Sequence, residues 1–152
     1  MSFAEAKNIK QLSVIRMVAF SMLIFMPLVF LTLMFVVDPP QQSGGEIEIM
    51  LLILLIVGML QPLTIPIIGK IQIQNWLKEE SETKSPAALF VMLSIIKSAF
   101  IETIYIYGLI VYFLSGDMVK ALYFYPVGIA WSVVHWPTRR RFENFVSRLS
   151  EK

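Results

Sequence analysis

Cysteine is absent from this chain, and histidine occurs once, as His135. Without thiols the sequence has no disulfide framework, no thiolate metal site and no cysteine nucleophile. A single histidine cannot form a histidine-rich metal site, and neither a glycine-rich phosphate loop nor an HExxH helix is present. We therefore expect that the protein is not an enzyme and has no catalytic residues, no metal and no cofactor. We also expect no nucleic-acid partner.

Charged residues are scarce as well, at 16% of the 152 residues, whereas 57% are hydrophobic. This composition lies outside the usual range of soluble domains. The length fits one compact bundle, and apolar stretches of the roughly 20 residues needed to cross a bilayer can be located directly. The sequence therefore predicts an all-α, multi-pass integral membrane protein.

Four hydrophobic stretches are predicted to span the membrane, and they cover residues 17–37, 49–69, 87–114 and 121–136. The first is too long in its apolar region for a cleaved signal peptide, so we expect a retained signal anchor. Pro62 and Pro66 lie inside the second, where a kink packed against other helices is expected. Beyond this span the helix is expected to continue toward Lys78 and to break near residues 81–86.

Lysine and arginine are distributed unevenly about these spans. They precede the first span, lie between the second and third, and follow the fourth, whereas the loop after the first span has only acidic charges. Because cytoplasmic loops are enriched in Lys and Arg, both termini are predicted to be cytoplasmic. The chain would then comprise a cytoplasmic lead (1–16), a four-helix transmembrane domain (17–137) and a cytoplasmic tail (138–152), in the inner (plasma) membrane of the cell.

The tail is amphipathic, with apolar residues at helical spacing and basic residues around them. The basic residues predicted to contact the membrane surface are Arg139, Arg140, Arg141 and Arg148. We expect a helix that lies on the inner leaflet with its apolar face toward the lipid. The sequence leaves open whether this helix anchors the chain to lipid or docks on a partner protein.

One carboxylate, Glu102, is embedded in the third span. Such a residue costs about 2.5 to 3.5 kcal/mol near the bilayer centre by insertion scales, and it usually marks a pathway or a pair. Lys97 is on the same span, but five residues along a helix place the two side chains about 140° apart. A direct pair is therefore not expected, and the long Lys97 side chain can extend toward the inner headgroups.

Other polar residues are predicted to lie near Glu102. Ser98 and Tyr105 form a polar stripe with it along one side of the helix, and Thr103 adjoins the stripe. These hydroxyls either support Glu102 or bond back to carbonyls of their own helix. Gln61 of the second span would meet Glu102 at one depth if the hairpin turns in the polar loop between the two spans. These five residues form the predicted ion-binding site.

The segment "SAFIETIYIYGLIVYFL", residues 98–114, resembles the carboxyl-terminal helix of the rotor-ring proteolipid, subunit c, of F/V-type ATP synthases. The residues in register are Ala99, Phe100, Glu102, Ile106, Tyr107, Gly108 and Leu109. The resemblance implies that Glu102 alternately binds and releases a proton or a sodium ion. It also implies that Thr103 and Gln61 help to bind the ion.

Two functions remain open from the sequence. In the first, a proteolipid-like hairpin binds or relays a proton or small cation at Glu102. In the second, the chain is a non-catalytic accessory or assembly subunit of a larger membrane complex, and Glu102 satisfies a partner helix. The expected partners are the lipid bilayer together with either further copies of this chain or other membrane subunits.

Overall fold

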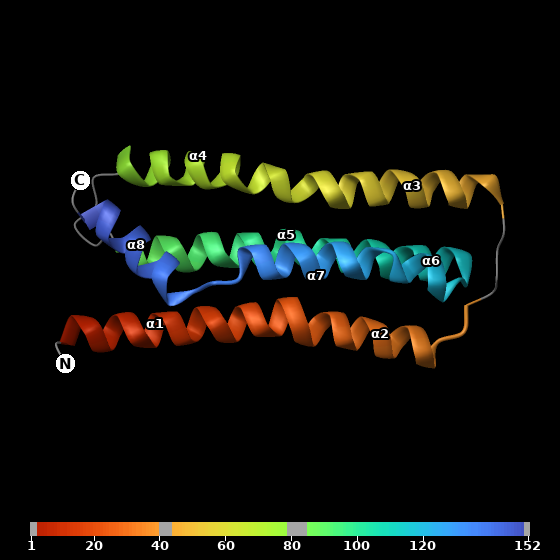
Figure 1. The fold of residues 1–152 in the computed structure, drawn as a ribbon, viewed down its shortest axis with the longest axis horizontal. Helices are drawn as coiled ribbons and strands as arrows, with labels where there is room; N and C mark the ends of the chain where they lie inside the picture. The colour runs from red at the N-terminus through yellow and green to blue at the C-terminus, as the bar shows by residue number, and fades with distance from the viewer. Residues whose placement is uncertain (1–2, 40–43, 79–84, 151–152) are drawn as a thin grey trace.

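The computed structural model describes residues 3–39, 44–78 and 85–150, and the regular structure within these ranges is entirely helical. In chain order the segments are α1 (Phe3–Phe20), the π-helical turn η1 (Ser21–Phe25), α2 (Met26–Val36), α3 (Gly45–Leu60), the 3-10 turn η2 (Gln61–Thr64), α4 (Ile65–Lys78), α5 (Pro86–Ser115), α6 (Met118–Leu122), α7 (Phe124–His135) and α8 (Arg139–Ser150). They form an elongated bundle (Figure 1). The all-α part of the prediction is confirmed.

Three helices in the described ranges are long and apolar enough to cross a membrane. They are Leu12–Val36, Gly45–Lys78 and Pro86–Ser115. These correspond to the first three predicted spans, and the second continues to Lys78 as expected. The predicted break after it falls mostly on residues 79–84, which lie outside the described residues.

The predicted fourth span, residues 121–136, is not one continuous helix. A turn at Tyr123 separates α6 from α7, and α7 has 12 residues, fewer than the roughly 20 that span a bilayer. Pro126 explains the interruption, because its ring clashes with the carbonyl of Leu122, four residues earlier, and it has no N–H to donate. This segment does not meet the length criterion, so the structure does not confirm a fourth span.

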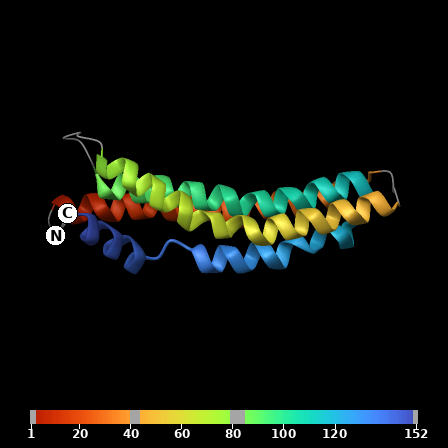
Figure 2. The same cartoon turned by 90° about the horizontal axis from the view of Figure 1, so that it is seen from above.

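Two short helices, α6 and α7, occupy the place expected for the fourth span, and α8 comes after them in the predicted tail. α6, α7 and α8 follow one another along α5 (Figures 1 and 2). α7 ends at His135 because Trp136 precedes a proline, and such a residue is disfavoured in the helical region. Trp136 accordingly has an extended ψ of 130°.

α8 contains most of the predicted amphipathic tail, and its apolar face packs on the bundle. Phe142 of α8 is only 3% exposed. The buried cluster around it contains Leu12, Ile15, Ala87 and Phe90. The rings of Phe90 and Phe142 meet edge to face, with centroids 5.3 Å apart. This corrects the prediction of an apolar face lying on the inner leaflet, because α1 and α5 already bury that face.

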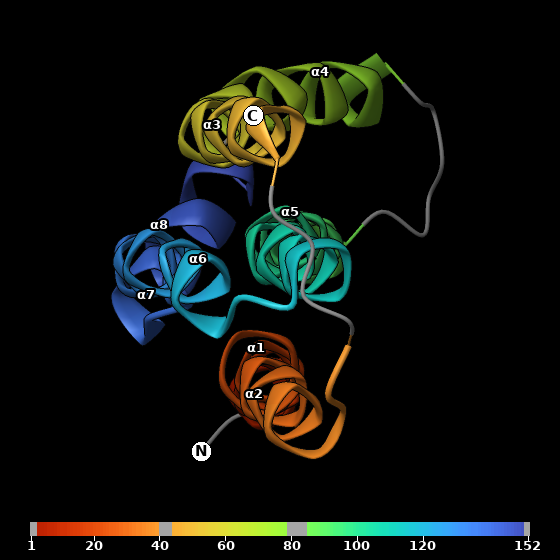
Figure 3. The ribbon, with the colours of Figure 1, turned by 90° about the vertical axis from the view of Figure 1, so that its right-hand side faces the viewer.

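α5 lies at the centre of the bundle. It contacts every other helical segment in the described part of the chain, and the end-on view shows α1–α2, α3–α4 and α6–α8 arranged around it (Figure 3). Ile101, Ile104 and Val111 of α5 are fully buried. Because lipid is as apolar as these side chains, such packing depends on close van der Waals contact and interhelical hydrogen bonds.

In two of the long helices, Leu12–Val36 and Gly45–Lys78, the helix type changes locally at a proline. Before Pro27, the N–H of Met26 bonds to the carbonyl of Ser21, five residues earlier. At Pro62, the carbonyl accepts instead from the N–H of Ile65, three residues later. These wider and tighter turns satisfy backbone groups that a regular helix with proline would leave unpaired.

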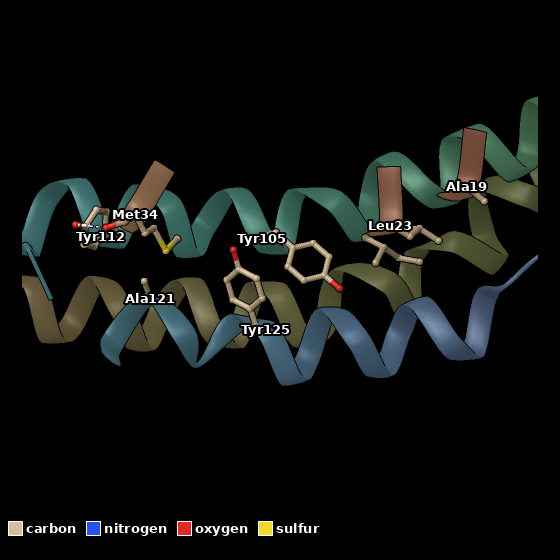
Figure 4. Close-up of a cluster of buried hydrophobic side chains, with 8 residues drawn as sticks. Ala19, Leu23, Met34, Tyr105, Tyr112, Ala121 and Tyr125 are labelled. Carbon is tan, nitrogen blue, oxygen red and sulfur yellow. Dashed lines mark hydrogen bonds between the residues drawn. The ribbon is translucent and has the colours of Figure 1, made fainter. Parts of the chain in front are cut away.

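Tyrosine hydroxyls hold the first membrane helix against the rest of the bundle. Tyr112 of α5 donates to the carbonyl of Met34 at 2.6 Å, and Tyr125 of α7 donates to the carbonyl of Pro27 at 3.1 Å. Figure 4 shows Tyr112 directed at the Met34 backbone. The Met34 carbonyl lies in the last turn of α2, where it needs such a partner in lipid because no water is present to supply one.

Candidate functional site

Glu102 lies near the middle of α5, and its side chain is partly exposed. The ion pairs in the described ranges are Lys120 with Asp117 and Arg139 with Glu143, and neither involves Glu102. Its carboxylate also makes no hydrogen bond with any described residue. Glu102 is therefore a carboxylate on the central helix of the bundle that has no partner in the described part of the chain.

Gln61 is hydrogen-bonded to α5 through both ends of its carboxamide. Its Nε2 donates to the carbonyl of Phe100 at 3.4 Å, and the hydroxyl of Tyr107 donates to its Oε1 at 3.0 Å. Glu102 lies between these two contact residues in the sequence, so Gln61 is at the level of Glu102 along α5. Both polar atoms of the carboxamide are nevertheless hydrogen-bonded to Phe100 and Tyr107, and not to Glu102.

Gln61 and Glu102 are separated by their angular positions around the α5 axis. Successive helical residues are about 100° apart, which places Glu102 about 160° from Phe100 and about 140° from Tyr107. Glu102 therefore lies on nearly the opposite side of α5 from the face that Gln61 contacts. The expected contact between carboxylate and carboxamide is not formed within one chain, because equal depth does not determine rotation.

The hydroxyls of Thr103 and Ser98 do not contact Glu102. Thr103 Oγ1 donates to the carbonyl of Ala99 at 2.9 Å, which is the local bond that serine and threonine commonly form in membrane helices. Ser98 is buried, and its hydroxyl has no hydrogen bond to the described residues. Thus neither hydroxyl forms part of an assembled ion-binding shell in a single copy of the chain.

Tyr105, the remaining member of the predicted site, is a core residue of the α5–α7 interface. It is 1% exposed, and its hydroxyl lies 3.4 Å from that of Ser132. Its ring meets that of Tyr125 edge to face (Figure 4), with centroids 5.2 Å apart. The small residues Gly128 and Ser132, four apart on α7, are the sequence signal for this close helix contact.

A pocket between α5, α8 and the α7–α8 connection brings together cations that the sequence analysis had treated separately. Its volume is about 790 Å³, and Lys97, His135, Arg141 and Arg148 are among the residues that line it. Among the described residues that line it, none is acidic. Sequence reasoning missed this site because Lys97 and the arginines are far apart in the chain, and only the docking of α8 places them together.

The four arginines predicted to contact the membrane surface have different environments. Arg139 pairs with Glu143 of its own helix at 2.6 Å, and Arg140 is exposed. Arg141 and Arg148 line the pocket. Arg141 Nη1 also donates to the carbonyl of Val134 at 2.7 Å, near the C-terminal end of α7, where a cation is favoured by the exposed carbonyls.

Comparisons with known proteins found no matching family model, curated protein or solved structure. The resemblance of residues 98–114 to the subunit c helix stays a hypothesis drawn from a single helix. Function must therefore be argued from the side chains of this chain and from their arrangement.

Proposed function

We propose that this chain is a non-catalytic subunit of a larger membrane complex, in which Glu102 binds a hydrogen-bond donor or cation on a neighbouring subunit. The proposal is carried by one observation, the unpartnered and partly exposed Glu102 on α5. A charged side chain near the bilayer centre costs about 2.5 to 3.5 kcal/mol by insertion scales. A donor from a second polypeptide offsets this cost.

Several donors near Glu102 in its own chain are engaged by other groups. The hydroxyl of Thr103 bonds to its own helix, and Tyr105 pairs with Ser132 on α7. Lys97 lies about 140° around the helix from Glu102 and lines the pocket beside α8. The hydroxyl of Ser98, one turn earlier, makes no hydrogen bond with Glu102 or with any other described residue. We therefore assign the donor to a neighbouring subunit.

The test compares the native mass of the detergent-extracted full chain with that of two variants. Glu102→Leu removes the carboxylate. The amount of complex recovered should then fall about tenfold, because one charge-assisted hydrogen bond in an apolar setting is lost. Glu48→Gln is the matched control, because Glu48 is exposed near the start of α3. Recovery of the wild type as a single chain, or of the same complex from Glu102→Leu, contradicts the proposal.

Proton relay at Glu102 is the second candidate function. The hydrogen bonds that Gln61 already makes to α5 favour a proton over a metal cation as the ion. A hard metal cation needs several oxygen ligands, whereas both polar atoms of the Gln61 carboxamide are bonded to α5. A proton needs only the carboxylate. The likeness of residues 98–114 to the subunit c helix supports the same function.

A carbodiimide that modifies protonated carboxylates tests this second candidate. Glu102 should be labelled, and Glu102→Gln should abolish proton flux into proteoliposomes, since an amide cannot exchange a proton in this way. Labelling that is absent at every pH, together with unchanged flux in Glu102→Gln, rules the relay out.

In the native-mass experiment, a mass that is a multiple of one chain would indicate that the neighbouring subunit is another copy.

A further inference from the structure

The cationic pocket contains positive charge without a visible counter-charge. Lys97 comes from α5, and Arg141 and Arg148 come from α8. In the described ranges none of these three takes part in an ion pair. Lys97 is only partly exposed, and a partly buried ammonium without a counter-ion is unfavourable. The pocket is therefore suited to an anion.

Two of the lining groups are held in place by hydrogen bonds to the α7 backbone and its C-terminal connection. Arg141 Nη1 donates to the carbonyls of Val134 and Trp136 at 2.7 and 3.3 Å. A guanidinium has five N–H donors, so others remain for a ligand. His135 Nδ1 donates to the carbonyl of Trp131 at 3.2 Å, so Nε2 can donate to a ligand only when the ring is protonated. The preorganised guanidinium of Arg141 favours a group with several acceptor oxygens.

An apolar cavity adjoins the cationic pocket. Its volume is about 680 Å³, and it shares Ile73, Lys97, His135 and Phe145 with the pocket. The apolar side chains that line it farther along come from α4 and α5 and include Ile65, Pro66, Leu77 and Leu93. Both helices belong to segments long and apolar enough to span a membrane. Lys70 and Gln74 of α4 also line this cavity. The combined site thus has a cationic end and a mostly apolar end that includes one further lysine.

We propose that this combined site binds one anionic phospholipid. The phosphate occupies the end lined by Lys97, Arg141 and Arg148, and an acyl chain lies against α4 and α5. A soluble phosphate ester has the same charge, but it leaves the apolar cavity unfilled, which is why the lipid is favoured. The site lies on residues other than Glu102, so this proposal does not depend on the proposed function.

The binding experiment uses the full chain in detergent and native mass spectrometry. Phosphatidylglycerol should remain bound about tenfold more tightly than phosphatidylcholine with the same acyl chains, because only the former has a net negative charge to meet the cations. The soluble compound sn-glycerol 3-phosphate, at the same concentration, should show no retained complex. It has the phosphate without the acyl chains.

The double variant Lys97→Gln with Arg148→Gln should lose phosphatidylglycerol retention by about tenfold or more. The control is Lys78→Gln with Arg140→Gln, which removes the same charge at two exposed positions outside both cavities and should keep wild-type binding. If the first double variant fails to fold, Lys97→Arg serves instead. It retains the charge and should retain the lipid.

Three results would overturn the proposal. Equal retention of phosphatidylcholine removes the role of the anion, and equal retention of sn-glycerol 3-phosphate shows that a soluble phosphate ester is the ligand. Equal loss of binding in the two double variants shows only a general attraction between a basic protein and acidic lipid. A Lys97→Arg variant that folds and does not bind also contradicts the assigned phosphate position.

Discussion

At the scale of single residues, the glycine most closely approached by another side chain in the described part of the chain is Gly128, which lies under the ring of Tyr105. A Cβ added to Gly128 would lie 2.5 Å from the Tyr105 ring atom Cζ. We predict that Gly128→Ala destabilises the protein by about 1 to 3 kcal/mol, the usual effect of overpacking a core. The thermal midpoint of the detergent-solubilised protein should fall accordingly.

Gly69 offers the matched control for this substitution. It lies in α4, and a Cβ there would meet no atom within 4 Å. Alanine is favoured over glycine in a helix by about 1 kcal/mol, so Gly69→Ala should leave the midpoint unchanged or raise it. A Gly128→Ala variant as stable as Gly69→Ala would show that the α5–α7 contact is looser than described.

At the scale of elements, Phe142 is the buried side chain through which α8 packs on the bundle, and Phe145 and Val146 pack beside it. The Phe142 side chain is 3% exposed, and its buried neighbours belong to α1 and α5. We predict that Phe142→Ala increases the amide hydrogen exchange of residues 139–150 severalfold while exchange in α3 stays unchanged, because the lost contacts are those that dock α8. The measurement is hydrogen–deuterium exchange read by mass spectrometry.

Ser147→Ala is the control for α8, since Ser147 is exposed on the same helix and should leave exchange unaltered. Unchanged protection of α8 in Phe142→Ala would mean that other contacts hold the helix. In that case the predicted surface position of the tail on the inner leaflet would have to be considered again.

At the scale of the whole molecule, α8, the beginning of α1 and the beginning of α5 lie at one end of the bundle, and the beginning of α3 lies at the other (Figure 1). The positive-inside rule predicts that the α8 end is cytoplasmic. The chain has no cysteine, so single cysteines can be placed without a background. Exposed Glu46, at the start of α3, and exposed Ser147, in α8, mark the two ends.

We predict that a membrane-impermeant thiol reagent labels Glu46→Cys in intact cells and labels Ser147→Cys only after permeabilisation. The unmodified chain should remain unlabelled under both conditions. Labelling of Ser147→Cys in intact cells, with Glu46→Cys protected, would reverse the orientation. Labelling of both positions in intact cells would place the two ends on the same side, which contradicts helices that each cross the membrane.

The first three helices were predictable from the sequence because long apolar runs report on membrane crossing one segment at a time. The continuation to Lys78 followed from the local pattern for the same reason. The fourth span is not confirmed, because hydropathy is averaged over Pro126 whereas the helical backbone is interrupted just before it, at Tyr123. The polar residues of the third span were located by sequence, but their partners were not.

Composition and hydropathy alone predicted a helical membrane protein with a carboxylate embedded in its third apolar helix, because both are local properties of the chain. The tertiary structure decided which way each polar group points. It directs Gln61 to Phe100 and Tyr107 and brings Lys97 beside Arg141 and His135. Hydropathy and span length give depth along a helix, whereas rotation and contact depend on how helices distant in the chain pack together.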